Sequence, residues 1–107
     1  MIDESKMERA LQFLAETDEK AASLKADVAR TEYVAKLRES SAYLTASGET
    51  VKERESIAKT APDVQEGWDL HFKAIAEFEK VRARRERAVL VCDLFRTLAA
   101  NRRAGQV

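Results

Sequence analysis

Apolar residues recur every three or four positions along the first part of the chain, the spacing of one face of an α-helix. We expect this helix to span residues 4–47, because Ser5 and Glu8 form a capping box at its start and Gly48 can end it as a left-handed cap. Favourable i,i+4 ion pairs support it further. Its apolar positions are Met7, Ala10, Leu14, Ala21, Leu24, Val28, Ala35 and Ala42.

Two more helices follow from the same kind of signal. Thr50 and Glu53 form a second capping box, which opens a short helix over residues 51–60. Pro62 ends that helix and suits the first turn of the next one, which we expect over residues 62–103 with Gly105 as its stop. The main apolar positions of this third helix are Leu70, Ala74, Phe78, Val81, Ala88, Cys92, Phe95 and Ala99.

A second apolar line on the third helix has no obvious partner within the chain. Two long helices joined by a short one predict an all-α single domain over residues 1–107, folded as an antiparallel helical hairpin. Stripes built largely of alanine bury little apolar area, so we expect a second chain to complete the hairpin into a helical bundle as a homodimer. The candidate protein-interface residues are Trp68, Phe72, Ile75, Leu90 and Leu94.

Two charged residues interrupt the apolar stripes. Glu32 falls near the centre of the first stripe and Arg85 near the centre of the third-helix stripe. We hypothesise that they pair, either with each other or across a dimer. The alternative is that their long stems carry the charges out to water.

Composition narrows the classes of protein. Hydrophobic residues make up 45% and charged residues 36% of the 107 residues, with three Gly and one Pro, which is typical of long solvated helices. The formal net charge is zero, so the chain as a whole is not a basic nucleic-acid binder. A single cysteine, together with the lack of a signal peptide or a membrane-length apolar run, leads us to expect a cytoplasmic protein without membrane contact.

No catalytic constellation is visible in the sequence. His71 and Cys92 stand 21 residues apart on one expected helix, about 30 Å, so they cannot form a nucleophile–base pair within one chain. We expect His71 to be structural and Cys92 to be a small core residue. Metal-ligand spacings and glycine-rich phosphate loops are absent. We therefore expect no enzyme, cofactor, metal or small-molecule substrate.

Basic residues gather on one face of the third helix. Successive residues turn by 100° on a helix, which aligns four of them, and a fifth extends the row. Such a stripe can follow a phosphate backbone. The alternative is a solvated or protein-binding face, because Glu77 and Glu79 lie close enough to neutralise part of it. The nucleic-acid-binding candidates are Lys73, Lys80, Arg84, Arg87 and Arg102.

Several segments resemble a group of small helical proteins of bacteriophages and prophages whose function is uncharacterised. The resemblance is carried by residues 78–86 and 95–105, by the connector 48–54, and by Thr17-Asp18-Glu19 with Lys25-Ala26. It implies an accessory protein in the bacterial host cell that binds DNA or a DNA-processing protein in recombination or replication. The alternatives are a module that inhibits a host protein and a structural bundle component. The resemblance assigns no role to any residue.

Overall fold

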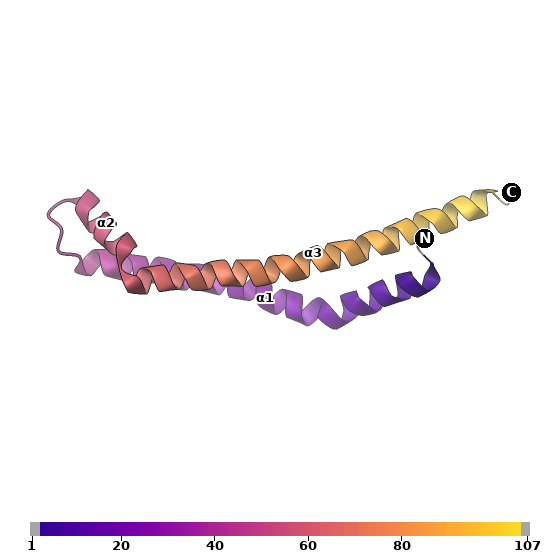
Figure 1. Cartoon of the computed structure of the whole chain (residues 1–107), viewed down its shortest axis with the longest axis horizontal. Helices are drawn as coiled ribbons and strands as arrows, with labels where there is room; N and C mark the ends of the chain where they lie inside the picture. Colours follow the sequence, from indigo (N-terminus) through magenta and orange to yellow (C-terminus); the bar gives the residue numbers. More distant parts are fainter. Residues whose placement is uncertain (1–2, 106–107) are drawn as a thin grey trace. The chain divides into compact units, whose positions relative to one another are not determined.

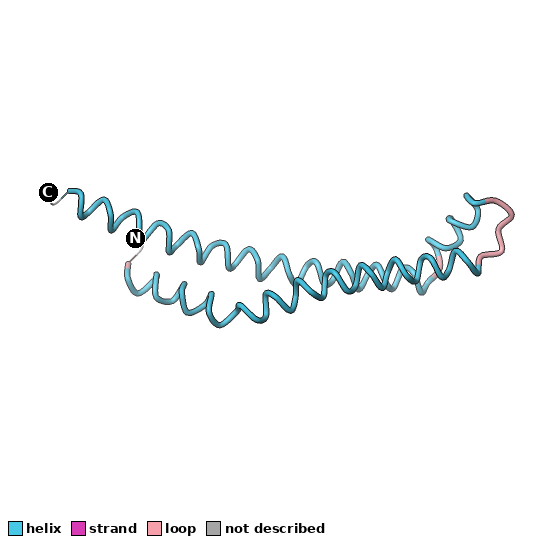
Figure 2. The backbone as a smooth tube through the Cα atoms, turned by 180° about the vertical axis from the view of Figure 1, so that it is seen from behind, coloured by secondary structure: helices cyan, strands magenta, loops and turns pink. Residues whose placement is uncertain are grey.

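The computed structural model describes residues 3–105, and helices cover nearly all of them. The helices are α1 (Glu4–Thr45), α2 (Val51–Thr60) and α3 (Pro62–Gly105), labelled in Figure 1. Over residues 3–105 there is no strand, and the backbone in Figure 2 consists of helices and short loops alone. The predicted all-α class and the order of two long helices around a short one are confirmed.

The chain forms two compact units, which we describe separately. The terminal unit comprises the described residues of 1–22 and 79–107, and the central unit comprises residues 23–78. In the terminal unit, Ala10 of α1 packs with Ala88 and Cys92 of α3. In the central unit, Thr31 of α1 contacts His71 of α3. In both units α1 and α3 run antiparallel, because positions later in α1 face positions earlier in α3, as a hairpin requires.

Buried and half-buried positions on both long helices repeat at alternating spacings of three and four residues, the pattern of a two-helix coiled coil. Leu70 was expected in this series but is 44% exposed, whereas His71 is 7% exposed. The reason is the repeat itself: counting back from Phe78 gives 74, 71, 67 and 64, and Val64 is 1% exposed. The covered α3 positions are Val64, Gly67, His71, Ala74, Phe78, Val81, Arg85, Ala88, Cys92, Phe95 and Ala99.

α1 begins at Glu4, the predicted first residue, but its cap differs from the predicted Ser5–Glu8 box. Asp3 caps the helix, with its Oδ1 accepting from Lys6 N at 2.9 Å, so Ser5 lies inside the helix and does not form a box with Glu8. Asp3 precedes Ser5 and offers a side-chain oxygen to the free N–H groups of the first turn, so it takes the capping role that was assigned to Ser5. The hydrogen bond to Lys6 N also lowers the pKa of the Asp3 carboxyl.

The other helix ends are close to their predictions. Thr50 caps α2, with its Oγ1 accepting from Glu53 N at 3.1 Å, and α3 begins at Pro62, both as predicted. The second half of the predicted box differs, because Glu53 Oε2 accepts from Glu49 N at 2.9 Å. α1 ends at Thr45, two residues before the expected 47. α3 continues to Gly105, so this glycine is the last helical residue and not a stop after 103.

Gly48 has a different role from the one predicted. No described glycine has a positive φ, so Gly48 is not a left-handed cap. A Cβ at this position would lie 2.8 Å from Glu53 Cβ and 2.9 Å from Arg54 N. Arg54 Nε also donates to the Gly48 carbonyl oxygen at 2.8 Å. Glycine is required here because the loop passes close to the first turn of α2.

Candidate interaction surfaces

The interior of the terminal unit is built from small residues. Ala10 and Ala88 are 8% exposed and Cys92 is 5% exposed, which confirms Cys92 as a core residue. Larger side chains pack against this centre and are themselves only partly buried. The partly buried residues packed against it are Met7, Phe13, Leu14 and Val91.

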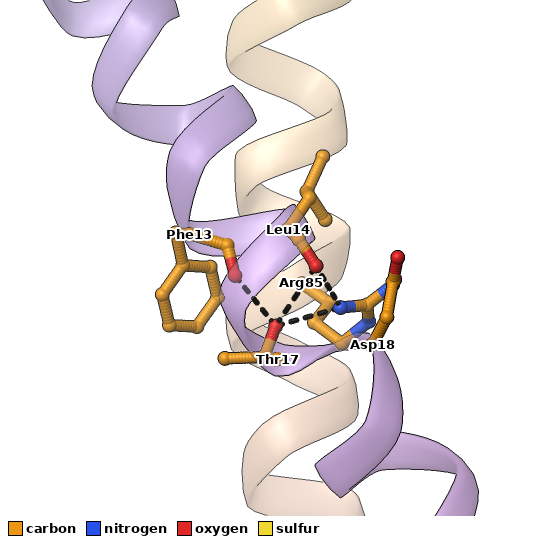
Figure 3. A network of polar contacts seen from close by, with 5 residues as sticks. All are labelled: Phe13, Leu14, Thr17, Asp18 and Arg85. Carbon is orange, nitrogen blue, oxygen red and sulfur yellow. Dashed lines mark hydrogen bonds and ion pairs between the residues drawn. The ribbon is translucent and has the colours of Figure 1, made fainter.

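Arg85 crosses from α3 to α1 in the terminal unit (Figure 3). Its Nη1 donates to the Leu14 carbonyl oxygen at 2.8 Å and to Thr17 Oγ1 at 2.6 Å, and its Nη2 donates to Asp18 Oδ1 at 2.5 Å. Thr17 Oγ1 donates to the Phe13 carbonyl oxygen at 2.7 Å. The guanidinium thus binds three oxygen atoms within one turn of α1. These contacts fix the register of α1 against α3, that is, which residues of the two helices lie opposite each other.

The expected pairing of Glu32 with Arg85 is wrong. Arg85 pairs with Asp18 of its own unit, and Glu32 pairs with Lys36 at 3.0 Å on the same helix. The Lys36 hydrogen bond lowers the pKa of the Glu32 carboxyl. Both charged groups therefore have an ion-pair partner within this chain. The Glu32 side chain is 45% exposed, so it also reaches water.

The central unit has a polar contact of the same kind as Arg85 with Thr17. His71 Nδ1 lies 3.1 Å from Thr31 Oγ1, and Thr31 Oγ1 donates to the Asp27 carbonyl oxygen at 2.8 Å. The Thr31 hydroxyl and the His71 ring thus join α1 to α3, with the direction of the hydrogen bond set by the tautomer of the ring. His71 therefore has a structural place in the helix contact. Across residues 3–105, no three His, Cys, Asp or Glu residues gather in a way that could hold a metal ion.

The basic candidates divide between the units. Lys80, Arg84, Arg87 and Arg102 belong to the terminal unit and are exposed, whereas Lys73, also exposed, belongs to the central unit. The four candidates of the terminal unit all lie on α3.

The cations of residues 80–87 differ in what they already bind. Glu79 accepts from Arg82 at 2.9 and 2.6 Å, and this hydrogen bonding raises the pKa of the Arg82 guanidinium. Arg85 is bound to Asp18. Arg84 and Arg87 make no ion pair or side-chain hydrogen bond with any residue from 3 to 105. Of these arginines, Arg84 and Arg87 are the ones available to a ligand.

The apolar candidates also divide between the units. In the central unit, Phe72 is 59% exposed, while Trp68 is half-buried and its Nε1 donates to Glu39 Oε2 at 3.3 Å. Ile75 is half-buried. In the terminal unit, Leu90 is 55% and Leu94 42% exposed. Sequence reasoning missed three further exposed apolar residues of the terminal unit, which the seven-residue repeat would have placed outside the helix contact: Leu11, Val89 and Leu98.

Each unit has a groove on its surface. In the central unit, a groove of about 550 Å³ lies between the end of α1 and α2, with Tyr43, Leu44 and Ala58 among its lining residues. In the terminal unit, a shallow groove runs between α1 and α3, lined by Lys6, Arg9, Ala10, Phe13, Ala88 and Val91. The first has a mixed lining with charges of both signs, whereas the second has an apolar floor and only basic charges.

No protein-family model, curated protein or solved structure matches the chain. Within the described residues, none of the helices has an apolar stretch long enough to cross a membrane.

Proposed function

We propose that the chain is a non-enzymatic accessory protein that works by binding other macromolecules, beginning with a second copy of itself. The observation that carries this proposal is the end of α3. Ala88 and Cys92 are buried on the side of α3 that faces α1. On its other sides, four apolar residues are 38–55% exposed: Val89, Leu90, Leu94 and Leu98. Exposed apolar residues gathered on one stretch of a helix mark a surface that further protein covers.

The accessory role is supported by the resemblance to small phage and prophage proteins. In that setting the partner beyond the second copy is a DNA-processing protein of recombination or replication in the bacterial cytoplasm. Inhibition of a host protein is the alternative use of the same surface. A DNA-processing partner fits the basic residues that follow the apolar line on α3, Arg102 and Arg103.

Replacing Leu94 with Asp should weaken self-association at least tenfold, since burying an unpaired carboxylate in the contact costs more than about 1.4 kcal/mol. The matched control is Leu44→Asp, because Leu44 is 82% exposed and lies in the central unit. Sedimentation equilibrium of both variants measures the effect. Equal dissociation constants for Leu94→Asp and the unchanged chain would remove this surface from the self-association.

Direct DNA contact is a second candidate, favoured by Arg84, Arg87 and Arg102, which have no ion partner within residues 3–105. The formal net charge of zero limits its strength. About three phosphate contacts imply weak binding whose logarithm falls with the logarithm of salt at a slope near −3.

Fluorescence anisotropy of a labelled duplex at increasing salt tests this candidate. The double variant Arg84→Ala/Arg87→Ala should reduce the salt slope by about 2, because each lost phosphate contact removes about 0.9. The control is the double variant Lys25→Ala/Lys52→Ala, at two exposed positions of the central unit. Direct DNA contact would be excluded if the chain did not bind the duplex at low salt, or if its affinity did not change with salt concentration.

A further inference from the structure

We propose that the groove between α1 and α3 of the terminal unit binds an amphipathic helix with acidic ends, supplied by another protein. Its floor is formed by Ala10, Phe13, Ala88 and Val91, and its only charged lining residues are Lys6 and Arg9. The proposal rests on the proposed protein-binding function, but it concerns residues other than Leu90 and Leu94, neither of which lines this groove.

Each floor residue has a basic residue four positions before it in the chain. Lys6 precedes Ala10, Arg9 precedes Phe13, Arg84 precedes Ala88 and Arg87 precedes Val91. Residues four apart are neighbours on one face of a helix, so each base stands one turn from its floor residue. Because α1 and α3 run antiparallel here, the α1 bases lie at one end of the groove and the α3 bases at the other.

The distance between the two basic ends follows from the register. Thr17 stands level with Arg85, which it contacts at 2.6 Å. Residues 84–87 of α3 therefore lie opposite about residues 15–18 of α1. Along α1, this position is roughly nine residues, or about 14 Å, from the midpoint of Lys6 and Arg9. A bound helix would place apolar side chains over the floor for about two turns and carboxylates on either side of them.

The nearby acidic groups leave the bases at the α3 end available. Asp18 is bound to Arg85, and Glu16 accepts from Gln12 Nε2 at 2.8 Å. Arg84 and Arg87 have no hydrogen-bonding or ionic partner in the described range 3–105. At the α1 end, Arg9 Nε donates to the Ser5 carbonyl oxygen at 3.4 Å, and its charge adds to the Lys6 N hydrogen bond in lowering the pKa of the Asp3 carboxyl.

An acidic helix fits this groove better than a nucleic-acid backbone does. Phosphates would meet the bases but leave Phe13 and Val91, both half-buried, against water. An amphipathic helix covers the apolar floor with its anchors and meets the basic ends with carboxylates, as in helix-in-groove recognition. Complementary charge at both ends also fixes the position of the helix along the groove.

The test uses the whole chain and a fluorescein-labelled peptide of about four helical turns, with Leu at i, i+3, i+4 and i+7 in its centre and Glu at both ends. A peptide of the same composition with the order scrambled is the peptide control. The groove variant is Arg9→Glu/Arg87→Glu, both exposed positions. Its matched control is Lys25→Glu/Lys52→Glu, which makes the same charge change at two exposed positions of the central unit.

We expect the groove variant to lose at least tenfold in affinity for the ordered peptide, the control variant to bind normally, and the scrambled peptide to bind at least tenfold more weakly. The inference is overturned by no binding, by equal loss in both variants, or by equal binding of the scrambled peptide. Displacement of the peptide by equimolar duplex DNA would instead identify a nucleic-acid surface. Because Phe13 lies in the groove, Phe13→Ala adds a variant that leaves the charge unchanged.

Sedimentation of the same samples separates this inference from the proposed self-association. A groove variant that still self-associates but does not bind the peptide is the expected result. Self-association without any peptide binding would remove the groove inference alone. Peptide binding by a monomeric chain would remove self-association alone.

Discussion

Replacing Gly67 with Leu is expected to lower the free energy of unfolding of the central unit by about 3 kcal/mol. Gly67 is buried where α3 meets α1, and Ala35 opposite it is 0% exposed. A Cβ at Gly67 would lie 3.3 Å from Ala35 Cα and 3.1 Å from Arg38 Cδ. The larger side chain must therefore push the helices apart, because backbone atoms leave no room for its methyl groups.

Urea unfolding followed by circular dichroism measures this loss. Gly105→Leu is the matched control, since nothing lies within 4 Å of a Cβ at that position. Gly67→Ala should change stability by less than about 1 kcal/mol, because its gain in helix propensity offsets a tight contact that Arg38 can relieve. Equal stability of Gly67→Leu and Gly105→Leu would show that the helices do not approach closely at Ala35.

Replacing Arg85 with Ala is expected to cost about 2 kcal/mol of stability, the range for a charge-assisted hydrogen-bond donor whose partners lose their bonds. The Arg85 side chain is 24% exposed and holds three oxygens of α1. This loss is smaller than the sum for three separate hydrogen bonds, because Asp18 is 67% exposed and water can replace its bond to Arg85.

Arg84→Ala is the control for that variant, since Arg84 is the same residue type next in the chain and is exposed. It should change stability by less than about 0.5 kcal/mol. The double variant Thr17→Val/Arg85→Leu removes both sides of the polar contact and should recover most of the loss. Thermal unfolding of the three variants decides the matter, and an Arg85→Ala loss no larger than that of Arg84→Ala would contradict the account.

The sequence predicted the helices well because their signals are local. Thr50 accepts a hydrogen bond from the N–H of Glu53, three residues later, and Pro62 affects the backbone only within one helical turn. Gly48 was misread for the same reason. Its identity permits a left-handed cap, but the approach of Glu53 and Arg54 decides its role, and only the folded loop shows that approach.

The contacts between helices could be predicted only in part, since they join distant residues. Leu70 was placed in the contact because it is apolar, yet the seven-residue repeat puts His71 there, with Thr31 as its partner 40 residues away. Arg85 finds Asp18 at a separation of 67 residues. A pattern of apolar residues does not reveal such polar pairs. In the sequence, each partner is simply a polar residue that interrupts an apolar stripe, and nothing shows that the two meet.

The same limit applies to the candidate surfaces. Charge spacing selected a row of bases on α3, but it could not separate Arg82, which is bound by Glu79, from Arg84, which has no partner among residues 3–105. The groove could not be foreseen either, because its lining residues come from two helices and become neighbours only when the register of α1 against α3 is known.

The mass of the chain in solution tests the central claim most directly, because that claim is that the apolar surface at the end of α3 is covered by a second molecule. Sedimentation equilibrium over a range of concentrations should give at least twice the 12.1 kDa of one chain, falling toward 12.1 kDa on dilution. A mass of 12.1 kDa at every concentration, with Leu90 and Leu94 still exposed, would contradict the account.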